Sequence, residues 1–527
     1  MVGEIDAGAL RAAFGDGAEL AVIDVREEGV FGMNHLLRAA NIPLSGIELS
    51  IRDFVPRKAT RIVLIDDNDG LAPRAARVLA AAGYGDLAIL KGGVSGWADA
   101  GFELFSGMNV PSKVFGEHIE HHCGTPNISA QALKQKIDAG ENMVILDSRP
   151  MDEFNRMSIP GGIDAPGAEL VRHVLDLAPD PDTLVVVNCA GRTRSIIGAQ
   201  SLINAGTPNR VMALTNGTMG WHLAGLALEH KATRTYDDVS GGALDWSLKA
   251  VAGVARKYGV RHIDTDTLAR WQSEAAARTL YLFDVRSPDE FTAGHVAGSR
   301  CAPGGQLVQA TDRFAVTANS RIVLIDDTGV RATMTASWLI QMGWTDVHVL
   351  DGGLENMARE SGPRSVAAPE VDAVSVTGVA PSDVDLDDVL VIDLADSLTF
   401  RDGHIAGAWW AIRARLADAL TRLPAAKSYL VTSADGRLAR LGAADLALVT
   451  KSPVRFLEGG SAAWRAAGLP MEEGYTRLAA EKEDIFYKPY DREGTVEDAM
   501  NQYLSWEIEL INQIKRDGSL AFPEFAP

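Results

Sequence analysis

The stretch TLVVVNCAGRTRSIIGAQ, residues 183–200, decides the fold class of this chain. It begins with a short, continuous apolar run, which is typical of a strand buried on both faces in a parallel sheet. It ends inside SIIGAQSLINAG (residues 195–206), which predicts a helix that stops at a glycine. Because buried strands and helices alternate in this way, we expect an α/β fold.

The same order of segments recurs four times along the chain. Each copy opens with an apolar strand that ends in Asp and closes with a short strand that runs into a Gly turn. The opening residues are Asp24, Asp147, Asp284 and Asp393, and the closing ones are Gly93, Gly217, Gly353 and Gly460. The two landmarks are 67 to 70 positions apart in every copy. This repeat predicts four tandem domains, each long enough to bury its own core.

We expect each domain to hold a mainly parallel sheet flanked by helices. The expected domain boundaries are 1–107, 108–235, 236–365 and 366–475, followed by a C-terminal helical tail at 476–527. The tail contains VEDAMNQYLSWEIELINQIKRDG, which predicts an amphipathic helix that ends at Gly518. We expect this helix to pack across a domain face; the alternative is a partner-binding helix.

Composition limits the partners and the compartment. The chain has 527 residues, with 50 Lys and Arg against 70 Asp and Glu, so its formal charge is −20. Such a surface repels nucleic acid and anionic membranes. Three cysteines, Cys123, Cys189 and Cys301, are too few for a disulfide framework, which favours a reducing compartment. The start does not resemble a signal peptide and no apolar run reaches membrane-spanning length, so we expect a cytoplasmic protein.

The loop after the second strand of each copy is the expected ligand site, because ligands of open α/β sheets bind at the carboxyl ends of strands. The residue at its tip is Asp66, Cys189, Asp326 or Ser433. Of these, Cys189 is the nucleophile that can act without an adjacent base. The helix dipole favours its thiolate by only about 0.3–1 kcal/mol. Loop N–H groups and the cations Arg192 and Arg194 are expected to supply the remainder and to attract an anionic substrate.

These segments resemble the rhodanese (thiosulfate sulfurtransferase) homology domain. The opening signature is represented by Asp147–Arg149 with Glu153–Phe154, and by Asp284–Arg286 with Glu290–Phe291 and the turn at residues 294–298. The closing signature is represented by Gly-Gly-x-x-x-Trp in copies one and four, and the active-site loop by Cys189 and Arg194. The arrangement is similar to bacterial proteins with four rhodanese domains in tandem.

The resemblance implies a sulfurtransferase that needs no cofactor and no metal. Cys189 would carry a persulfide between a small anionic donor, such as thiosulfate, and a thiol, cyanide or protein acceptor. Cys189 and Arg194 would be catalytic, and the substrate-binding residues would be Ala190, Gly191, Arg192, Thr193 and Ser195. Arg192 stands where many relatives have Gly, which favours a larger or more anionic donor. The related phosphatases have one more residue between Cys and Arg, so the loop length here favours sulfur transfer over phosphatase or arsenate reductase chemistry.

The resemblance also implies that copies one, three and four are inactive. Copies one and two would form one pair, with the active site at the cleft between them, and copies three and four a second pair. The alternative function is a largely non-catalytic scaffold or a persulfide relay to a protein partner, and a homodimer is allowed.

Several other residues invite chemical interpretations. The run HIEHHC (residues 118–123) predicts a linker helix; a metal site and a resolving role for Cys123 are the alternatives. Cys301 is expected to be a packed turn residue. His295 and His404 lie in Gly-His turns, where we expect a structural hydrogen bond.

Overall fold

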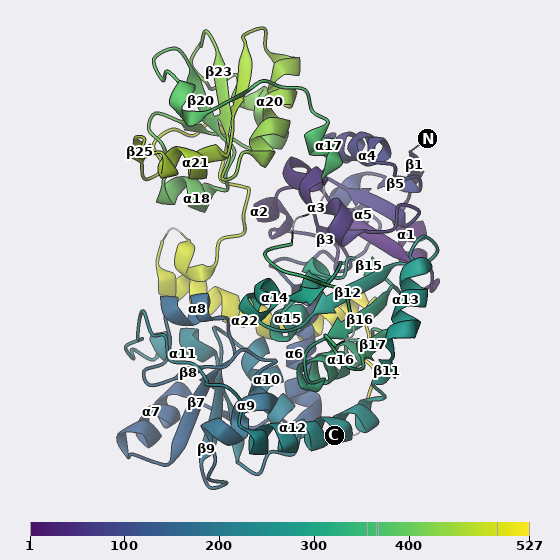
Figure 1. The fold of residues 1–527 in the computed structure, drawn as a ribbon, viewed down its shortest axis with the longest axis vertical. Helices are drawn as coiled ribbons and strands as arrows, with labels where there is room; N and C mark the ends of the chain where they lie inside the picture. The colour runs from purple at the N-terminus through teal and green to yellow at the C-terminus, as the bar shows by residue number, and fades with distance from the viewer. Residues whose placement is uncertain (1, 356, 365, 367, 493, 526–527) are drawn as a thin grey trace. The chain divides into compact units, whose positions relative to one another are not determined.

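The computed structural model describes residues 2–355, 357–364, 366, 368–492 and 494–525. Figure 1 shows them as a ribbon coloured from the N-terminus to the C-terminus. They belong to two compact units. The first unit comprises Met1–Leu10, Ala21–Met108 and Ser365–Tyr487, and the second comprises Arg11–Leu20, Asn109–Arg364 and Lys488–Pro527. Apart from Arg11–Leu20, domain 1 therefore falls with domain 4 in the first unit, and domains 2 and 3 fall in the second. The expected pairing of copies one and two is wrong, because domain 2 forms its compact unit with domain 3.

The four domain sheets share one topology. Numbered by their order within the five-stranded pattern of each domain, the strands follow the spatial order 1-5-4-2-3 in every copy. The strand pairs of these sheets in domains 2, 3 and 4 are parallel, and domains 3 and 4 each have a separate two-stranded antiparallel sheet. Parallel neighbours require a crossover helix, which explains the alternation of buried strands and helices in the sequence. The expected α/β fold with repeated, helix-flanked sheets is confirmed, and the fourth copy has the same sheet as the others.

Domain 2 carries the cysteine loop. Its strands are β6 (Asn127–Ile128), β7 (Met143–Asp147), β8 (Ile163–Asp164), β9 (Leu184–Asn188) and β10 (Val211–Leu214). Its helices are α7 (Ala130–Asp138), α8 (Met151–Arg156), α9 (Leu170–Leu177), α10 (Thr193–Asn204) and α11 (Gly217–Leu223). All five residues of β9 are buried, as a central parallel strand requires.

Domain 3 repeats this arrangement. Its strands are β11 (Arg261–Ile263), β12 (Leu280–Asp284), β14 (Arg300–Cys301), β16 (Arg321–Ile325) and β17 (Val347–Leu350), with the short strands β13 (His295–Val296), β15 (Thr317–Ala318) and β18 (Arg359–Glu360). Its helices are α13 (Thr265–Ser273), α14 (Pro288–Ala293), α15 (Gly304–Gln309) and α16 (Val330–Gln341). Val330 and Met334 of α16 share one apolar core with Leu170 and Val187 of domain 2, so these two domains are packed together.

The first unit contains the other two copies. Domain 1 has β1 (Gly3–Ile5), β2 (Leu20–Asp24), β3 (Ala40–Asn41), β4 (Arg61–Ile65) and β5 (Leu87–Leu90), with α1 (Ala7–Ala13), α2 (Glu28–Phe31), α3 (Ile47–Phe54), α4 (Leu71–Ala81) and α5 (Gly93–Asp99). Domain 4, which follows α17 (Pro369–Asp372), has β19 (Gly378–Val379), β20 (Leu390–Asp393), β21 (His404–Ile405), β22 (Trp409–Trp410), β23 (Tyr429–Thr432), β24 (Val454–Leu457) and β25 (Met471–Glu472), with α18 (Ser397–Asp402), α19 (Leu416–Ala419), α20 (Arg437–Val449) and α21 (Gly460–Ala466).

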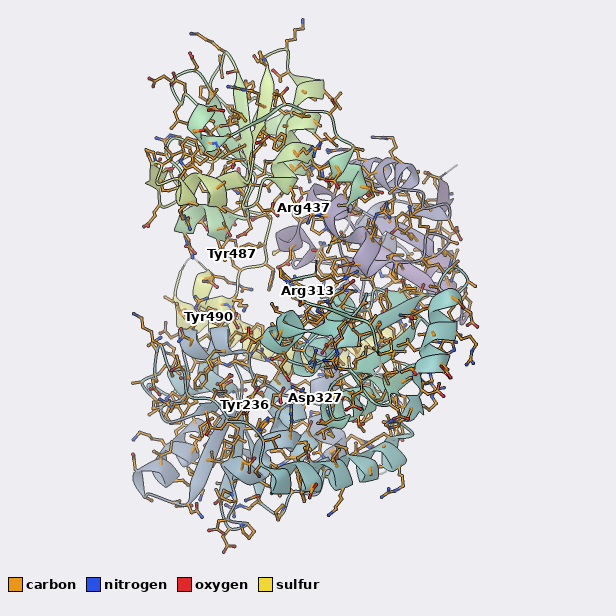
Figure 2. All side chains as sticks on the ribbon, viewed as in Figure 1. Tyr236, Arg313, Asp327, Arg437, Tyr487 and Tyr490 are labelled. Carbon is orange, nitrogen blue, oxygen red and sulfur yellow. The ribbon has the colours of Figure 1, made fainter. Side chains whose placement is uncertain are left out.

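Three further helices of the second unit lie outside the repeated domain pattern. They are α6 (Val110–Cys123), α12 (Gly241–Tyr258) and α22 (Val496–Asp517). α22 is the predicted tail helix, and Gly518 caps its end in the left-handed conformation, with φ 62°. Before α22, the Tyr490 ring (labelled in Figure 2) lies 4.4 Å from the guanidinium carbon of Arg156 on α8. From Lys488 onward the tail therefore packs on domain 2, in line with the expected packing on a domain face, whereas its residues up to Tyr487 belong to the first unit. Among the described residues, no helix is both long and apolar enough to cross a membrane.

Candidate active site

The cysteine loop lies between β9 and α10. β9 ends at Asn188 and α10 begins at Thr193, so Cys189 follows a buried strand directly, at the carboxyl edge of the sheet. Its residue is 2% exposed. The predicted position of the loop is therefore correct, and the thiol sits in a shielded environment close to a helix N-terminus.

The closing glycine of each copy holds this loop in place. Gly217 has a φ of 53°, and a Cβ there would collide with the carbonyl oxygen of Cys189. That oxygen instead accepts a hydrogen bond of 2.8 Å from the N–H of Thr218. In the other copies a Cβ at the closing glycine would collide with the equivalent carbonyl oxygen, in the pairs Gly93 with Asp66, Gly353 with Asp326 and Gly460 with Ser433. The repeated glycine is thus explained by close contact with the loop.

The opening Asp and Arg form a buried support beneath the loop. Asp147 accepts two hydrogen bonds of 2.8 Å from the Arg149 guanidinium and one of 2.7 Å from the side-chain amide of Asn188. The corresponding Asp–Arg pairs of domains 1 and 3 are Asp24 with Arg26 and Asp284 with Arg286. Domain 4 has Ala395 at the Arg position. The Asp–Arg pair of the opening signature therefore stabilises the end of the strand beneath the loop.

In the three loops without cysteine, the tip side chain points towards the backbone N–H groups of its own loop. Each tip residue accepts hydrogen bonds from backbone N–H groups of its own loop. The donors are Asn68 and Ala72 to Asp66, Gly329, Arg331 and Ala332 to Asp326, and Gly436 and Ala439 to Ser433. The donor six residues after the tip recurs in all three loops, at 2.9, 3.4 and 3.1 Å. The fold thus builds a ring of N–H groups around the tip side chain.

Arg194 is held beside the loop by residues from two domains. Its guanidinium contacts Glu153 of α8 at 2.8 and 3.1 Å and the side-chain oxygen of Gln306 of α15 at 3.4 Å. Burial alone would raise the pKa of Glu153, but the Arg194 charge outweighs it and lowers that pKa to about 2. Burial likewise opposes the charge of Arg194, while Glu153 and Cys189 raise its pKa. Arg194 therefore stays charged next to Cys189.

Arg192 has a different environment from the one expected. Its guanidinium donates to Glu117 at 2.6 and 2.7 Å and also contacts Glu120, both on the linker helix α6. Two carboxylates thus compensate the charge of Arg192. We infer that Arg192 fixes the loop to α6, and that the expected attraction of the donor depends on Arg194.

The linker and tail helices contribute charged residues that the sequence analysis missed. Glu507 of α22 is fully buried. Its Oε1 accepts a hydrogen bond of 2.7 Å from the Thr193 hydroxyl and one of 3.2 Å from the ammonium of Lys113 on α6. Burial opposes the charge of Lys113, but Glu507 raises its pKa. Lys113 is therefore a cation near the loop whose charge is compensated by Glu507.

α22 lies directly against the loop at Gly191. A Cβ at Gly191 would lie 3.3 Å from Oε2 of Glu507 and 3.3 Å from a ring carbon of Tyr503, which is tighter than most Cβ contacts and shows how closely the helix approaches the loop. Ala190 packs in a small apolar cluster with Met219, Met500 and Leu504. Ser195 donates from its hydroxyl to the Arg192 carbonyl at 2.8 Å. The tail helix therefore covers the loop.

The other two cysteines have environments that disfavour the thiolate. Burial raises the pKa of Cys301 to about 11 and also raises that of Cys123. Cys301 ends the strand β14 and does not lie in the expected turn, and Cys123 ends α6.

The histidines have structural contacts. Residues 118–123 form the end of the predicted linker helix, where the rings of His118 and His122 stack with centroids 5.4 Å apart. No group of three or more His, Cys, Asp or Glu that could hold a metal is found in the described part of the chain. His295 and His404 stack on Phe291 and Phe400, with centroids 3.7 Å apart, and each also contacts that residue's carbonyl oxygen.

Together, the fold and the site define an α/β repeat protein in which one of four equivalent loops carries a buried cysteine at its tip. The model of the rhodanese-like domain family matches residues 6–100, 129–224 and 264–360, which is more than half of the chain. The chain therefore belongs to the rhodanese-like domain family. The fourth domain lies outside these matches but has the same strand order.

Individual relatives agree with this assignment. The crystal structure of a thiosulfate sulfurtransferase from Pseudomonas aeruginosa is 47% identical, covers 100% of both chains and superposes with a TM-score of 0.96. Thiosulfate sulfurtransferase GlpE from Pseudomonas paraeruginosa is 30% identical over 95 residues, which are 17% of this chain and 84% of that protein. Putative sulfur carrier protein YrkF from Bacillus subtilis is 29% identical over 107 residues, 20% of this chain and 56% of that protein. The chain thus spans about half the length of YrkF.

Proposed function

We propose that this chain is a sulfurtransferase that carries sulfane sulfur as a persulfide on Cys189. The observation that carries the proposal is the ring of N–H groups seen in the other three loops. By position, the donors to Asp326 correspond to the N–H groups of Arg192, Arg194 and Ser195 around Cys189. A ring that receives a carboxylate or hydroxyl oxygen elsewhere in the chain is suited to an anionic sulfur here.

The reaction that fits this site is a double displacement. The Cys189 thiolate attacks the outer sulfur of thiosulfate, and a new S–S bond forms while the donor's own S–S bond breaks. Sulfite leaves with the bonding electron pair. A thiolate or cyanide acceptor then attacks the outer sulfur of the Cys189 persulfide, and the Cys189 thiolate is released. The two steps need no external oxidant or reductant.

Residues around the loop have defined roles in this proposal. Arg194 binds the sulfonate oxygens of the donor. Glu153 holds Arg194 in position. α22 and the apolar cluster around Ala190 shield the persulfide from water. The comparisons support sulfur transfer in general, and thiosulfate is proposed as donor because two of the relatives are thiosulfate sulfurtransferases.

The second candidate is a persulfide relay that serves a protein acceptor. Two features favour it: Cys189 is almost completely buried beneath α22, and YrkF is named as a putative sulfur carrier protein. A relay would accept sulfur from a protein donor but would turn over small donors poorly, because a protein partner is needed to open the site.

One experiment separates these functions. The full-length chain is incubated with thiosulfate, its intact mass is measured, and turnover is followed with cyanide and with dithiothreitol as acceptors. The enzyme predicts a gain of one sulfur atom, mapped to the Cys189 peptide, and turnover that disappears in Cys189→Ser. Cys301→Ser is the matched control and should behave like the parent chain. Loading from a protein persulfide donor without thiosulfate turnover would favour the relay, and absence of any sulfur on Cys189 would contradict both.

A further inference from the structure

Domains 2 and 3 face each other through two matching segments. These are APGAE at residues 165–169 and APGGQ at residues 302–306. Their glycines are in close contact, because a Cβ at Gly305 would lie 3.1 Å from the backbone nitrogen of Gly167. A larger residue at this contact would push the two domains apart.

The last residue of each segment reaches across to the loop arginine of the other domain. Glu169 of domain 2 accepts a hydrogen bond of 2.8 Å from Arg331 of domain 3. Reciprocally, Gln306 of domain 3 accepts a hydrogen bond of 3.4 Å from Arg194 of domain 2. Arg331 and Arg194 occupy the same position in their loops, five residues after the tip. The interface therefore brings equivalent partners to equivalent arginines, but one partner is a carboxylate and the other is an amide.

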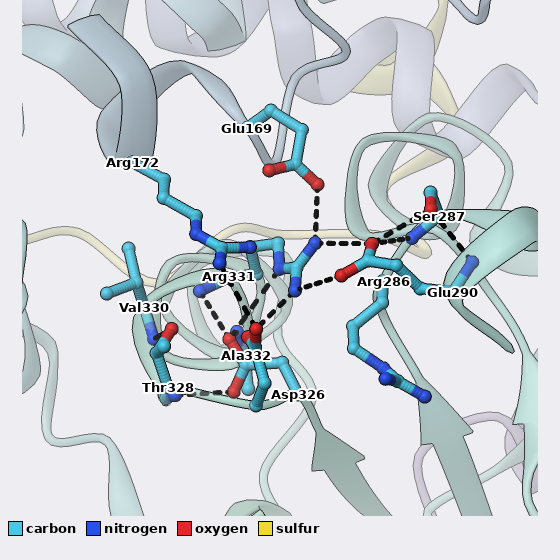
Figure 3. A network of polar contacts seen from close by, with 12 residues as sticks. Glu169, Arg172, Arg286, Ser287, Glu290, Asp326, Thr328, Val330, Arg331 and Ala332 are labelled. Atoms are coloured by element: carbon cyan, nitrogen blue, oxygen red, sulfur yellow. Dashed lines mark hydrogen bonds and ion pairs between the residues drawn. The ribbon is translucent and has the colours of Figure 1, made fainter. Parts of the chain in front are cut away.

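The two arginines consequently differ in electrostatic compensation. Three carboxylates lie 2.8 Å from Arg331, those of Glu169, Glu290 and Asp327. Figure 3 shows the contacts of Arg331 with Glu169 and Glu290. Among the described residues, one carboxylate lies within ion-pair distance of Arg194, that of Glu153 at 2.8 Å. The charge of Arg331 is thus more than balanced locally, while that of Arg194 meets a single opposing charge and a neutral amide. Only the latter arrangement is suited to a second, anionic partner.

Loose packing beside Arg194 makes the hydrogen bond to Gln306 important for the position of the guanidinium. A cavity of about 30 Å³ lies between α10 and domain 3, lined by Thr193, Arg194, Gly304, Thr335 and Trp338 among others. Close packing normally fixes a buried side chain, and a void removes part of that restraint. The Arg194 guanidinium therefore depends on its hydrogen bonds for its position, and one of the two groups that accept them comes from domain 3.

We propose that Gln306 is a positioning residue of the Cys189 site, which selects anionic sulfur donors by holding Arg194 without cancelling its charge. Domain 3, whose own loop carries Asp326 in place of cysteine, thereby supplies a component of the active site of domain 2. The inference rests on the proposed sulfurtransferase function for the identity of the donor. The local charge that it describes can be measured without that function.

The first test is Gln306→Glu, which gives Arg194 the partner that Arg331 has. The Michaelis constant for thiosulfate is expected to rise about tenfold or more, because a second carboxylate now competes with the donor for the guanidinium. kcat should change less than about twofold, since the thiolate is untouched. Glu169→Gln, the same exchange in reverse on the facing domain, is the matched control and should leave both constants unchanged. Gln306→Leu, which keeps the site neutral, should raise the Michaelis constant a few fold.

The second test measures the charge at Cys189 directly. The rates of alkylation by iodoacetate, which is anionic, and by iodoacetamide, which is neutral, are determined for the Cys189 peptide by mass spectrometry. The ratio of the two rates should fall about threefold or more in Gln306→Glu and should not change in Glu169→Gln. This readout separates the two hypotheses. If the parent chain does not turn over thiosulfate but the ratio still falls in Gln306→Glu, only the proposed function is refuted.

The inference would be overturned by an unchanged alkylation ratio in Gln306→Glu. It would also be overturned by an unchanged Michaelis constant in both Gln306 variants of an active enzyme, or by a Cys189 that neither reagent alkylates. Thermal unfolding of each variant shows whether the fold is kept, and Gln306→Leu decides the question if Gln306→Glu does not fold.

Discussion

The Cys189 loop of domain 2 and the Asp326 loop of domain 3 have the same backbone arrangement. They differ in the residue at the tip and in the number of carboxylates around the loop arginine. Both follow a buried strand, both have a glycine packed against the tip carbonyl, and both place an arginine five residues after the tip. In domain 3, the Asp326 carboxylate fills the ring of N–H groups, and further carboxylates surround Arg331. Domain 3 thus contains its own anion at the tip of the loop, whereas domain 2 has a thiol there.

Domains 1 and 4 differ from the active loop in a second way. Asp66 and Ser433 also fill their rings, and the arginine position is occupied by Leu71 and Leu438. Three loops of the chain have therefore lost the cysteine, and two of them have also lost the cation. The comparison between domains 2 and 3 is the more informative one, because there the cation is kept and only its surroundings have changed.

The largest expected effect is that of Cys189→Ser. The hydroxyl is far less acidic than a thiol and cannot carry a persulfide, so sulfur loading and turnover should fall by about a thousandfold or more. Intact mass after incubation with thiosulfate measures the loss. Cys123→Ser is a control that should keep full loading. A sulfur that remains bound after Cys189→Ser would show that another cysteine does the chemistry.

Arg194→Ala tests the cation that the two loops share. Loss of a charge-assisted hydrogen bond to the donor should lower kcat/KM for thiosulfate about 10- to 150-fold, equivalent to about 1.5–3 kcal/mol. The variant also leaves Glu153 without its partner. Comparing it with the double variant Glu153→Gln and Arg194→Ala shows how much of the loss in kcat/KM comes from the uncompensated carboxylate. An unchanged kcat/KM would contradict the electrostatic account of donor binding.

Asp326→Cys tests whether a cysteine is enough to convert domain 3. We expect less than about a tenth of the sulfur loading of Cys189, because the carboxylates around Arg331 repel thiosulfate. Adding Glu169→Gln and Asp327→Ala should increase the loading of the introduced thiol, which peptide mapping by mass spectrometry measures. Ser433→Cys is a negative control, since its loop has Leu438 at the arginine position. Full loading in the single variant would mean that the surroundings of Arg331 are unimportant.

The smallest expected effect concerns pH. Burial is the main cause that raises the pKa of Asp326, to about 6 from an ordinary 3.8. Because the folded chain then binds a proton more readily than the unfolded chain, this residue costs stability at neutral pH, and the cost decreases as pH falls from about 6 to 4. The cost is about 3 kcal/mol at most. The melting temperature of the parent chain should therefore improve relative to Asp326→Asn between pH 7.5 and pH 5. A constant difference would show that Asp326 is ionised throughout this range.

The sequence was sufficient for the repeat, the fold class and the position of the loop, because these depend on local patterns. Buried strands, the opening Asp, the closing Gly and the tip residue are each recognisable within a few positions. Glu153 was also identified from the sequence, because it belongs to the opening signature. Its contact with Arg194 was not predicted. The linker and tail helices were predicted correctly as helices.

The sequence did not predict which domains pair or what surrounds the loop. Copies one and two are adjacent in the chain, but Trp338 of domain 3 donates to Ser201 of domain 2 across a shared core. Lys113 and Glu507 lie outside the repeated domain pattern, and 394 positions separate them in the chain. The partners of Arg192 lie on the linker helix. Such contacts depend on tertiary packing, which local patterns do not encode.

The bond between Thr193 and Glu507 has a consequence for how the protein is made. These residues are 314 positions apart. At about 5–20 residues per second, a ribosome needs roughly 15–60 s to travel that distance. During this time the nascent chain has its cysteine but lacks the helix that covers it, so the thiol is open to oxidants and to other proteins. Maturation of the site therefore waits until α22 has been translated, and a truncation that removes this helix would uncover the loop even though the cysteine lies far upstream.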